Sequence, residues 1–571
     1  MEYKIVKADD HWFRENINCQ YACPVNTPAM NYIERIVAGD FDASLRLNFM
    51  ANLFPHILGR VCTHPCETAC RRGAIDKPIA ICSLKRSAAD FASVKSSRKP
   101  IRDEKTGKRV AIIGSGPSGL AAANDLATKG HDVVVYEALP VAGGMLCVGI
   151  PPYRLPREAI EDAVNWIKAL GVDIRLNSPI DTPEAFDDLL REFNAVYLAM
   201  GAHRSQLLEI PGEELEGVLH GVTFMKDTNL GLRKTVPERV AVLGGGFTAI
   251  DCARSSLRLG AREVSVMYRR TLEEMPAGEL EVRMAEQEGI QMHYLTSPVR
   301  IIGGHERKVT HIECIKNTLG EPDEKGRRRP VPVKGSNFMV PVDLIIAAIG
   351  QSPDISFLSD RCGIKINHWG MPVIDPKDFM TTRAGVFAGG DCVTGPRNVI
   401  EVIADGRKAA RAIHRFLTVE ERKGYTFYYK DQSPSDRMPD YDFAPRQSQD
   451  AIPMSQRRTL DAEVERGLSR ENTSQEAGRC LLCHYNIFID ESCILCGGCI
   501  DVCPHQCISM ASREKVEIPS DAEDGGAIAG DWDAVMVLDE EKCIRCGLCV
   551  KRCPVNAITM KRFSYSEEYE H

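Results

Sequence analysis

One stretch constrains the fold of this chain more than any other: Val110-Ala-Ile-Ile-Gly-Ser-Gly-Pro-Ser-Gly-Leu120. The apolar run predicts a buried strand, and the spaced glycines before an Ala-rich run predict a tight turn into a helix. Here Gly114 lets the chain turn, Gly116 lets backbone approach a pyrophosphate, and Gly119 lets the helix pack on the strand. The free N–H groups at the helix start would bind the phosphates of a dinucleotide.

The residues after this turn extend the same nucleotide site. A second strand predicted over 133–136 ends at Glu137, whose carboxylate can accept hydrogen bonds from both ribose hydroxyls. Glycines and prolines are dense around Gly144 and through 149–156, which contains Arg154. That density suggests backbone lying against a flavin, and we count Gly144 and Arg154 as candidate cofactor contacts. An ordinary loop is the alternative.

A second strand–glycine–helix pattern spans 239–251, with Gly244 and Gly246 in its turn. The next predicted strand ends in Arg269 and Arg270 instead of an acid. Arginines favour the 2′-phosphate of NADP, whereas an acid would favour a 2′-hydroxyl. An exposed basic turn is the alternative for this pair. Two fingerprints imply two nucleotides, most economically FAD at the first and NADP(H), or else NAD(H), at the second.

Later segments of the chain are predicted to resume the first nucleotide half. A strand ending in glycine is predicted over 342–350, and another over 385–391 contains Gly390 and Asp391. Asp391 could hydrogen-bond a ribityl hydroxyl. The Ala-rich helix predicted within 395–411 would place its N-terminus near the isoalloxazine O2 region and favour negative charge on reduced flavin.

Cysteine is the informative part of the composition: the 571 residues include 22, gathered at 19–82 and 480–553. Because no apolar signal region begins the chain, metal ligation is favoured over disulfides. The C-terminal group repeats Cys-x2-Cys-x2-Cys-x3-Cys-Pro, the two-cluster ferredoxin pattern, in which each fourth cysteine ligates the other cluster. We predict one [4Fe–4S] cluster on Cys493, Cys496, Cys499 and Cys553, and another on Cys543, Cys546, Cys549 and Cys503.

The N-terminal region, predicted to be helical, carries six cysteines: Cys19, Cys23, Cys62, Cys66, Cys70 and Cys82. Six ligands are too many for one [4Fe–4S] cluster and too few for two. Zinc is the alternative, although its usual two-residue gaps are absent. We interpret the remaining cysteines as packing residues. These are Cys147, Cys252, Cys314, Cys362, Cys392 and Cys507.

Five motifs are together very specific: Gly59-Arg-Val-Cys-Thr-His-Pro-Cys-Glu-Thr-Ala-Cys70, Gly114-Ser-Gly-Pro-Ser-Gly119, Gly149-Ile-Pro-Pro-Tyr-Arg-Leu-Pro156, Gly244-Gly-Gly-Phe-Thr-Ala-Ile-Asp251 and Ala388-Gly-Gly-Asp391. Through them residues 1–420 resemble the small (beta) subunit of NADPH-dependent glutamate synthase. They also resemble the N-terminal part of dihydropyrimidine dehydrogenase and the large subunit of NADH-dependent ferredoxin:NADP oxidoreductase. The resemblance implies FAD, then NADPH, and two N-terminal [4Fe–4S] clusters, for four clusters in all.

One segment departs from the family pattern. In those relatives Glu-Ala-x-Arg-Cys-x2-Cys runs directly into Cys-x3-Cys-Pro, whereas here it occurs at 476–483. We hypothesise that a linker returns Cys480 and Cys483 to complete a cluster with Cys19 and Cys70. The second N-terminal cluster would use Cys23, Cys62 and Cys66, with Cys82 as the candidate fourth ligand where relatives use a non-cysteine residue. Alternatively, Cys480 and Cys483 are unligated or belong to the ferredoxin module.

The predicted fold class is α/β, with two Rossmann-like domains, the second inserted in the first. A helical iron–sulfur domain precedes them and an α+β ferredoxin-like domain follows. The predicted bounds are 1–100 for the helical cluster domain, 101–235 and 341–420 for the FAD domain, 236–340 for the NAD(P)H domain, 421–484 for the linker, and 485–571 for the ferredoxin-like domain.

The net charge of -8 and the pI near 6.0 argue against nucleic acid as the main partner. No apolar run reaches the roughly 18 to 20 residues of a membrane span, so we expect a soluble, cytoplasmic protein. We expect no catalytic side chain, because flavin and clusters carry the chemistry.

The functional prediction is an electron-transfer subunit of a hetero-oligomer. It would move electrons between NAD(P)H and a partner oxidoreductase or ferredoxin. Alternatives are an NAD(P)+-reducing subunit of a 2-oxoacid or aldehyde oxidoreductase, the glutamate synthase small subunit, and a flavin-based bifurcating subunit. A self-contained enzyme and a redox-sensing scaffold are less economical, since no substrate domain is visible and both nucleotide fingerprints are intact.

Overall fold

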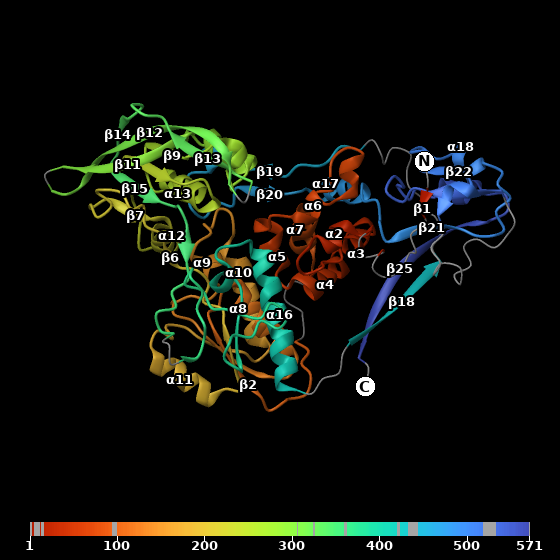
Figure 1. The fold of residues 1–571 in the computed structure, drawn as a ribbon, viewed down its shortest axis with the longest axis horizontal. Helices are drawn as coiled ribbons and strands as arrows, with labels where there is room; N and C mark the ends of the chain where they lie inside the picture. Colours follow the sequence, from red (N-terminus) through yellow and green to blue (C-terminus); the bar gives the residue numbers. More distant parts are fainter. Residues whose placement is uncertain are drawn as a thin grey trace. The chain divides into compact units, whose positions relative to one another are not determined.

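The computed structural model forms two compact units, each described here by itself (Figure 1). One unit comprises 1–97, 419–449 and 467–571, and the other comprises 98–418 and 450–466. The structure describes residues 3–4, 12, 16–93, 100–304, 306–323, 326–358, 362–418, 423–431, 444–517 and 533–569.

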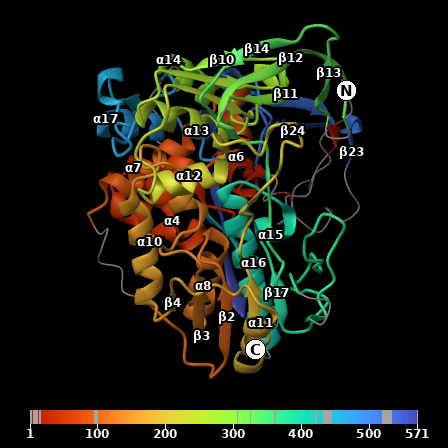
Figure 2. The ribbon, with the colours of Figure 1, turned by 90° about the vertical axis from the view of Figure 1, so that its left-hand side faces the viewer.

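The first sheet of the nucleotide-binding unit has five parallel strands in the order β17-β5-β2-β3-β4. Its strands are β2 (Arg109–Ile113), β3 (Asp132–Tyr136), β4 (Asp173–Arg175), β5 (Ala195–Leu198) and β17 (Val386–Ala388). The central strands are almost wholly buried, as expected for a parallel sheet covered on both faces. Figure 2 shows α8 (Pro117–Thr128) beside α16 (Val399–Leu417). This is the predicted Rossmann-like arrangement.

The other helices of this half are short or peripheral. They are α9 (Met145–Val148), α10 (Arg157–Ala169), α11 (Pro183–Glu192) and α15 (Asp391–Thr394). Two short strands, β6 (Arg204–Ser205) and β16 (Gln351–Ser352), pair with each other. Each of them lies at a point where the chain passes from one nucleotide sheet to the other.

The second sheet is also parallel, in the order β10-β9-β8-β15-β7. Its strands are β7 (Val218–His220), β8 (Arg239–Leu243), β9 (Glu263–Met267), β10 (Gln291–His293) and β15 (Leu344–Ala347). Its helices are α12 (Gly221–Asn229), α13 (Phe247–Arg258) and α14 (Glu279–Gln287). The bounds predicted from the sequence place 218–220 and 344–347 in the first half instead. A short apolar strand has the same sequence pattern in either sheet, and only pairing with β8 assigns β15 to this one.

Four antiparallel strands lie between β10 and β15 in the chain. They are β11 (Thr296–Gly303), β12 (Val309–Pro322), β13 (Arg328–Pro332) and β14 (Phe338–Pro341). Ile301 and Ile312 of this sheet pack with Ala241 and Leu243 of β8 in one apolar cluster. The antiparallel sheet therefore covers one face of the second nucleotide sheet.

Part of the predicted linker packs onto the nucleotide-binding unit. Residues 450–466 begin with β19 (Asp450–Ala451), which pairs with β20 (Glu465–Gly467). The Val464 N–H donates to the Tyr153 carbonyl oxygen at 2.9 Å, and Leu460 packs against the core of the second sheet. This segment thus contacts both the 149–156 loop and the second nucleotide half.

The other unit begins with the expected helices. They are α2 (Asn18–Tyr21), α3 (Ala29–Val37), α4 (Phe41–Asn52), α5 (Pro55–Val61), α6 (Pro65–Thr68), a 3-10 turn at Arg71–Ala74, and α7 (Ile81–Phe91). Their core also contains Leu468, Ala477 and Phe563 from the C-terminal part of the chain. The helix α17 (Arg470–Gly478), within the predicted linker, supplies Ala477.

The ferredoxin-like part has the internal repeat that the cysteine spacing predicts. Its elements are β21 (Tyr485–Ile489), α18 (Gly498–Asp501), β22 (Ile508–Ser512), β24 (Ala534–Leu538), α19 (Leu548–Arg552) and β25 (Ile558–Tyr569). β21 pairs with β25, and β22 with β24, so the first half of the repeat crosses to the second. β18 (Lys423–Asp431), from the predicted linker, runs along β25 in Figure 1, and β1 (Tyr3–Lys4) pairs with β23 (Val516–Glu517).

A buried ionic network connects α17 to the N-terminal helices. Glu476 is fully buried and accepts hydrogen bonds from the backbone N–H groups of Ala80 and Gln447, both at 2.7 Å. It also pairs with Arg479 at 2.8 Å. The Arg479 guanidinium donates in turn to Asp76 at 2.9 Å. The network lies directly before Cys480 and therefore sets the position of the next turn of chain.

We expect Glu476→Ala to destabilise the holoprotein by about 3–5 kcal/mol, because it leaves the Arg479 charge buried and two backbone donors without an acceptor. The measurement is the urea midpoint of the helical signal in circular dichroism. Glu471→Ala, on an exposed position of the same helix, is the control and should cost at most about 1 kcal/mol. Equal midpoints for the two variants would contradict the assignment.

Candidate functional site

The first glycine turn has the geometry that a dinucleotide requires. Gly114 has φ of 105°, and a Cβ there would lie 2.5 Å from the Ala199 carbonyl oxygen. A Cβ on Gly119 would lie 2.0 Å from the Gly114 carbonyl oxygen, which explains the close approach of α8 to β2. Gly116, the N-cap of α8, has open space on its Cβ side. That open side lies where backbone would face a phosphate.

Glu137 directly follows β3 and is buried at this turn. Its carboxylate accepts hydrogen bonds from the Ser115 N–H at 2.9 Å, the Ser115 hydroxyl at 2.5 Å and the Leu139 N–H at 2.8 Å. An ionised carboxylate has about four acceptor positions, so one stays available for a ribose hydroxyl. Glu137 therefore braces the turn and can also face a nucleotide.

Two other predicted glycines converge on the start of α8. A Cβ on Gly144 would lie 2.8 Å from the Gly116 Cα, and a Cβ on Gly390 would lie 3.1 Å from the Ser118 Cβ. Next to Gly390, Asp391 accepts a hydrogen bond from the Arg397 N–H at 3.0 Å. Burial raises the pKa of Asp391 to about 6. The structure thus brings the predicted FAD contacts from four chain segments to one helix start.

The Arg154 side chain points elsewhere. Its guanidinium donates to both oxygens of Asp251 at 2.9 Å and to Glu281 at 2.7 Å. Asp251 lies on α13 and Glu281 on α14, both in the second nucleotide half. In the structure, the Arg154 side chain therefore connects the Gly- and Pro-rich loop to the helices α13 and α14 of the second nucleotide half.

The second fingerprint repeats the first turn, but its two arginines differ. A Cβ on Gly244 would lie 2.3 Å from the Ala348 carbonyl oxygen, whereas Gly246 has open space. Arg270 is buried and donates to the Arg328 carbonyl oxygen at 2.6 Å, with Asp323 at 3.5 Å. Arg269 is exposed. Only Arg269 of the pair therefore keeps its guanidinium available to a 2′-phosphate, while Arg270 holds the β12–β13 hairpin.

The structure brings together the first predicted group of N-terminal ligands. Four thiols line one cavity: Cys19, Cys70, Cys480 and Cys483. Burial raises the pKa of the Cys19 thiol, and the nearby Cys483 and Cys480 raise it further. The two cysteines of the C-terminal segment therefore lie against the N-terminal helices, about 400 residues away in sequence, as hypothesised from the family pattern.

The remaining N-terminal cysteines form a second group. A hydrogen bond from the Cys82 thiol lowers the pKa of Cys62. Burial raises the pKa of Cys66 above its ordinary value, and Cys62 and Cys23 are among the charges that act on it. A buried cation, Lys85, lies one turn after Cys82 on α7 and interacts with all four thiols. Lys85 is not identified from the sequence, because the cysteine motif gives no signal for a lysine beside its thiols.

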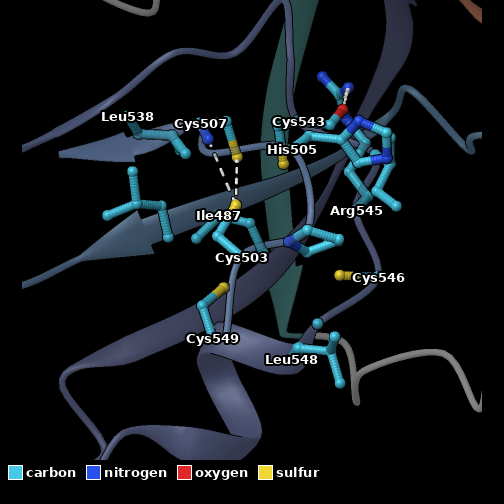
Figure 3. Close-up of a pocket in the computed structure, with 14 residues that line it drawn as sticks. Ile487, Cys503, His505, Cys507, Leu538, Cys543, Arg545, Cys546, Leu548 and Cys549 are labelled. Atoms are coloured by element: carbon cyan, nitrogen blue, oxygen red, sulfur yellow. Dashed lines mark hydrogen bonds between the residues drawn. The ribbon is translucent and has the colours of Figure 1, made fainter. Parts of the chain in front are cut away.

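Figure 3 shows the ferredoxin-like cavity, where sulfur atoms face a common space. Its cysteines are Cys503, Cys507, Cys543, Cys546 and Cys549. Cys503 thus joins the three cysteines of the second repeat, as the crossed pattern requires. Cys507, which we interpreted as packing, lies 3.2 Å from the Cys503 sulfur. Its place four residues after Cys503 was the signal for this contact.

The last predicted group has the most exposed ligand. Cys493 and Cys496 are the thiols that interact with Cys499, and Cys553 belongs to the same apolar cluster as Cys499. Cys496 is exposed. The other cysteines interpreted as packing residues are buried, except for the half-buried Cys147, and none of the 22 cysteines, all of which lie in the described residues, forms a disulfide.

Arginine side chains next to these cavities fit an anionic cluster. Both terminal guanidinium nitrogens of Arg71, which lines the first cavity, are buried and find no hydrogen-bond partner within the described residues. The sulfides and thiolates of a [4Fe–4S] cluster would satisfy them. In the described part of the chain no three potential ligands meet closely enough for a single metal ion. A cubane cluster instead binds its thiolates to separate iron atoms, which suits the more open groups seen here.

Three family models match the chain. Residues 108–406 match "pyridine nucleotide-disulphide oxidoreductase", residues 12–97 match "dihydropyrimidine dehydrogenase domain II, 4Fe-4S cluster", and residues 492–557 match "4Fe-4S dicluster domain". The predicted cofactor classes, FAD, a pyridine nucleotide and [4Fe–4S] clusters, and the predicted fold class are confirmed by these matches. Among the described residues, none of the helices is both long and apolar enough to span a membrane.

Curated relatives agree with the family resemblance. The NADP(+)-dependent formate dehydrogenase subunit beta of Moorella thermoacetica is 41% identical over an alignment of 500 positions that covers 82% of this chain and 70% of that protein. The NADPH-Fe(3+) oxidoreductase subunit beta of Geobacter sulfurreducens is 39% identical over 82% of this chain and 75% of its own length. The glutamate synthase [NADPH] small chain of Escherichia coli is 34% identical over 71% of this chain and 89% of that protein. With more than half of its residues matched by the family model, the chain belongs to the pyridine nucleotide-disulphide oxidoreductase family.

Proposed function

We propose that this chain is the NADPH-facing electron-transfer subunit of a hetero-oligomeric oxidoreductase. The observation that carries the proposal is the combination of two glycine-turn nucleotide sites with four cysteine groups in one chain. The similar formate dehydrogenase and NADPH-Fe(3+) oxidoreductase proteins are both named as beta subunits, which supports a partner subunit here.

The first turn would hold FAD and the second NADPH. The residues proposed for FAD are Gly114, Gly116, Gly119, Glu137, Gly144, Gly390 and Asp391, and those for NADPH are Gly244, Gly246 and Arg269. The first set of residues would hold a flavin whose chemistry, once bound, would be hydride exchange with the nicotinamide and onward transfer of single electrons. The protein groups position the nucleotides and exclude water, and we assign no side chain to general acid–base catalysis.

We propose four [4Fe–4S] ligand sets. They are Cys19, Cys70, Cys480 and Cys483; Cys23, Cys62, Cys66 and Cys82; Cys503, Cys543, Cys546 and Cys549; and Cys493, Cys496, Cys499 and Cys553. The shared cavities of the first and third sets support these assignments. We further propose a cytoplasmic location, because thiols that ligate clusters must stay reduced.

The partner sets the direction of electron flow in this proposal. The name of one relative describes an NADP(+)-dependent formate dehydrogenase, and that of another an NADPH-dependent iron reductase. A low-potential partner would drive reduction of NADP+, and an acceptor partner would draw electrons from NADPH. The same nucleotide and cluster sites serve both directions.

Anaerobic titration with NADPH tests the assignment of the nucleotides. We expect Gly116→Ala to weaken FAD binding about tenfold or more, because the new methyl group enters the space proposed for the pyrophosphate. Gly246→Ala should keep FAD but raise the KM for NADPH by a similar factor. FAD content and flavin bleaching are the measurements. Loss of FAD from Gly246→Ala, with Gly116→Ala unaffected, would reverse the assignment.

The nucleotide preference should depend on Arg269. Arg269→Ala removes a charged hydrogen bond to the 2′-phosphate, which contributes roughly 1.5–3 kcal/mol. We expect kcat/KM for NADPH to fall roughly 10- to 100-fold, with NADH oxidation unchanged. The matched control is Arg262→Ala, on an exposed arginine of the same half. An equal loss with both nucleotides would exclude 2′-phosphate recognition by Arg269.

The Cys480→Ser, Cys483→Ser double variant should lose the iron of one cluster and keep its FAD, because the two thiols line a cavity of one compact unit and the glycine turns belong to the other. Iron and acid-labile sulfide per flavin are the measurements. Cys147→Ser, which changes a half-buried thiol outside the four sets, is the control. Unchanged iron in the double variant would remove these cysteines from the ligand set.

A further inference from the structure

Two of the cysteine cavities lie in the same compact unit, and an arginine lines each one. Arg71 lines the cavity of Cys19, Cys70, Cys480 and Cys483, which we name the amino cage. Arg545 lines the cavity of Cys503, Cys543, Cys546 and Cys549, which we name the inner ferredoxin cage. Each arginine is next to a predicted cluster ligand in the sequence: Arg71 follows Cys70, and Arg545 precedes Cys546. The sequence alone assigns neither arginine a role.

Arg545 is held rigidly, and it is almost fully buried. Its guanidinium donates to the Tyr485 carbonyl oxygen at 3.0 Å and to the Cys543 carbonyl oxygen at 2.5 Å. A third hydrogen bond, at 3.1 Å, goes to Glu540. Tyr485 is only two residues after Cys483 of the amino cage. The contacts of Arg545 therefore join backbone from the edges of both cages. Figure 3 shows Arg545 beside Cys543 and Cys546 in the inner ferredoxin cage.

Arg71 has the opposite character, because its terminal nitrogens are buried without hydrogen-bond partners in the described residues. An unsatisfied buried guanidinium costs free energy unless an anion is nearby. Burial lowers the pKa of Arg71, and the charge of Arg545 lowers it further, whereas Cys483 and Cys543 raise it. Arg71 thus lies within electrostatic reach of one thiol from each cage.

The apolar packing between the cages is also continuous. Leu482, between Cys480 and Cys483, packs against the core of the N-terminal helices and against the core of the ferredoxin-like part. The strand β21 starts at Tyr485 and supplies Ile487 to the lining of the inner ferredoxin cage. A segment of eight residues, 480–487, therefore runs from one cage to the other.

We propose that Arg71 and Arg545, each lining one of the two cages, are cations that act on both the amino-cage cluster and the inner-ferredoxin-cage cluster, and that these clusters exchange electrons directly across the 480–487 segment and have linked reduction potentials. In each transfer one electron leaves the reduced cluster and enters the oxidised one, and no bond or proton moves. The inference rests on the proposed function only for the identity of the clusters. It adds which two clusters exchange electrons with each other, and two residues that set their reduction potentials.

The physical reason is the charge that reduction adds. Each reduction adds one negative charge to a buried cluster, and a buried cation nearby stabilises that charge more strongly than it would in water. Because the same two cations act on both clusters, removing one should shift both potentials in the same direction. The remaining ferredoxin-like cluster, with the exposed Cys496, is then the end of the chain of clusters that faces a partner.

The test uses the full-length holoprotein and dithionite redox titration followed by electron paramagnetic resonance. Arg71→Met should move the midpoints of two clusters to more negative values, with at least a tenfold change in their reduced-to-oxidised ratio at fixed potential, about 59 mV for one electron. Arg71→Lys should restore most of the shift. The control, Lys542→Met, removes an exposed cation adjacent to Cys543 and should leave both midpoints near the wild-type values.

A second variant of opposite sign covers the case in which Arg71→Met fails to assemble its clusters. Burial raises the pKa of Glu540 to about 7, so this titration is made at a pH well above 7, where the carboxylate is ionised. There Glu540→Gln removes the negative charge paired with Arg545, so both midpoints should become less negative. A shift of only one cluster, or equal shifts in Lys542→Met, would overturn the proposal. Because dithionite replaces NADPH here, these outcomes are independent of whether NADPH reduces the flavin, which tests the proposed function separately.

Discussion

The cluster-bearing unit depends on the buried ion pair between Glu476 and Arg479. Both side chains are fully buried, so each charge needs its hydrogen-bond partners. Glu476 accepts from the backbone N–H groups of Ala80 and Gln447, and Arg479 donates to the Asp76 carboxylate. The next residue after this pair is Cys480. The energetic requirement to satisfy two buried charges is therefore also what holds a C-terminal cysteine segment against the N-terminal helices, and a cavity lined by four thiols is the consequence.

The nucleotide-binding unit uses a different constraint, the close approach of backbone to backbone at glycines. Gly114 and Gly244 occupy positive-φ positions where a side chain would meet a carbonyl oxygen, and each leads into a helix whose first glycine is open to a ligand. The two halves are joined through Arg154, which reaches from the loop of the first to Asp251 and Glu281 of the second. The 450–466 segment packs along the same loop. Hydride transfer requires that the two nucleotides be held at a fixed distance and orientation. These contacts can hold the two nucleotide halves in place, because all of them lie within one compact unit.

Charge also distinguishes residues that look equivalent in the sequence. Arg269 and Arg270 are adjacent, yet one is exposed and the other is buried against the β12–β13 hairpin. Arg71 and Arg72 are adjacent as well, but Arg72 is paired with Asp76 while the terminal nitrogens of Arg71 are buried at a cysteine cavity without a partner in the described structure. In both pairs, burial and hydrogen bonding distinguish two arginines that the sequence places side by side.

Local spacing is enough to predict the glycine turns of both nucleotide sites and the crossed ferredoxin repeat. The residues of each motif, Gly114 to Gly119 or Cys543 to Cys549, are close in the chain, so backbone periodicity places them together. Family resemblance extended this to Cys480 and Cys483. Tertiary packing settles the other features: which sheet includes β15, which of Arg269 and Arg270 is exposed, and the positions of Arg71 and Arg545 at the two cysteine cavities. Those outcomes depend on strand pairing, burial and charge satisfaction between distant segments, which no local pattern encodes.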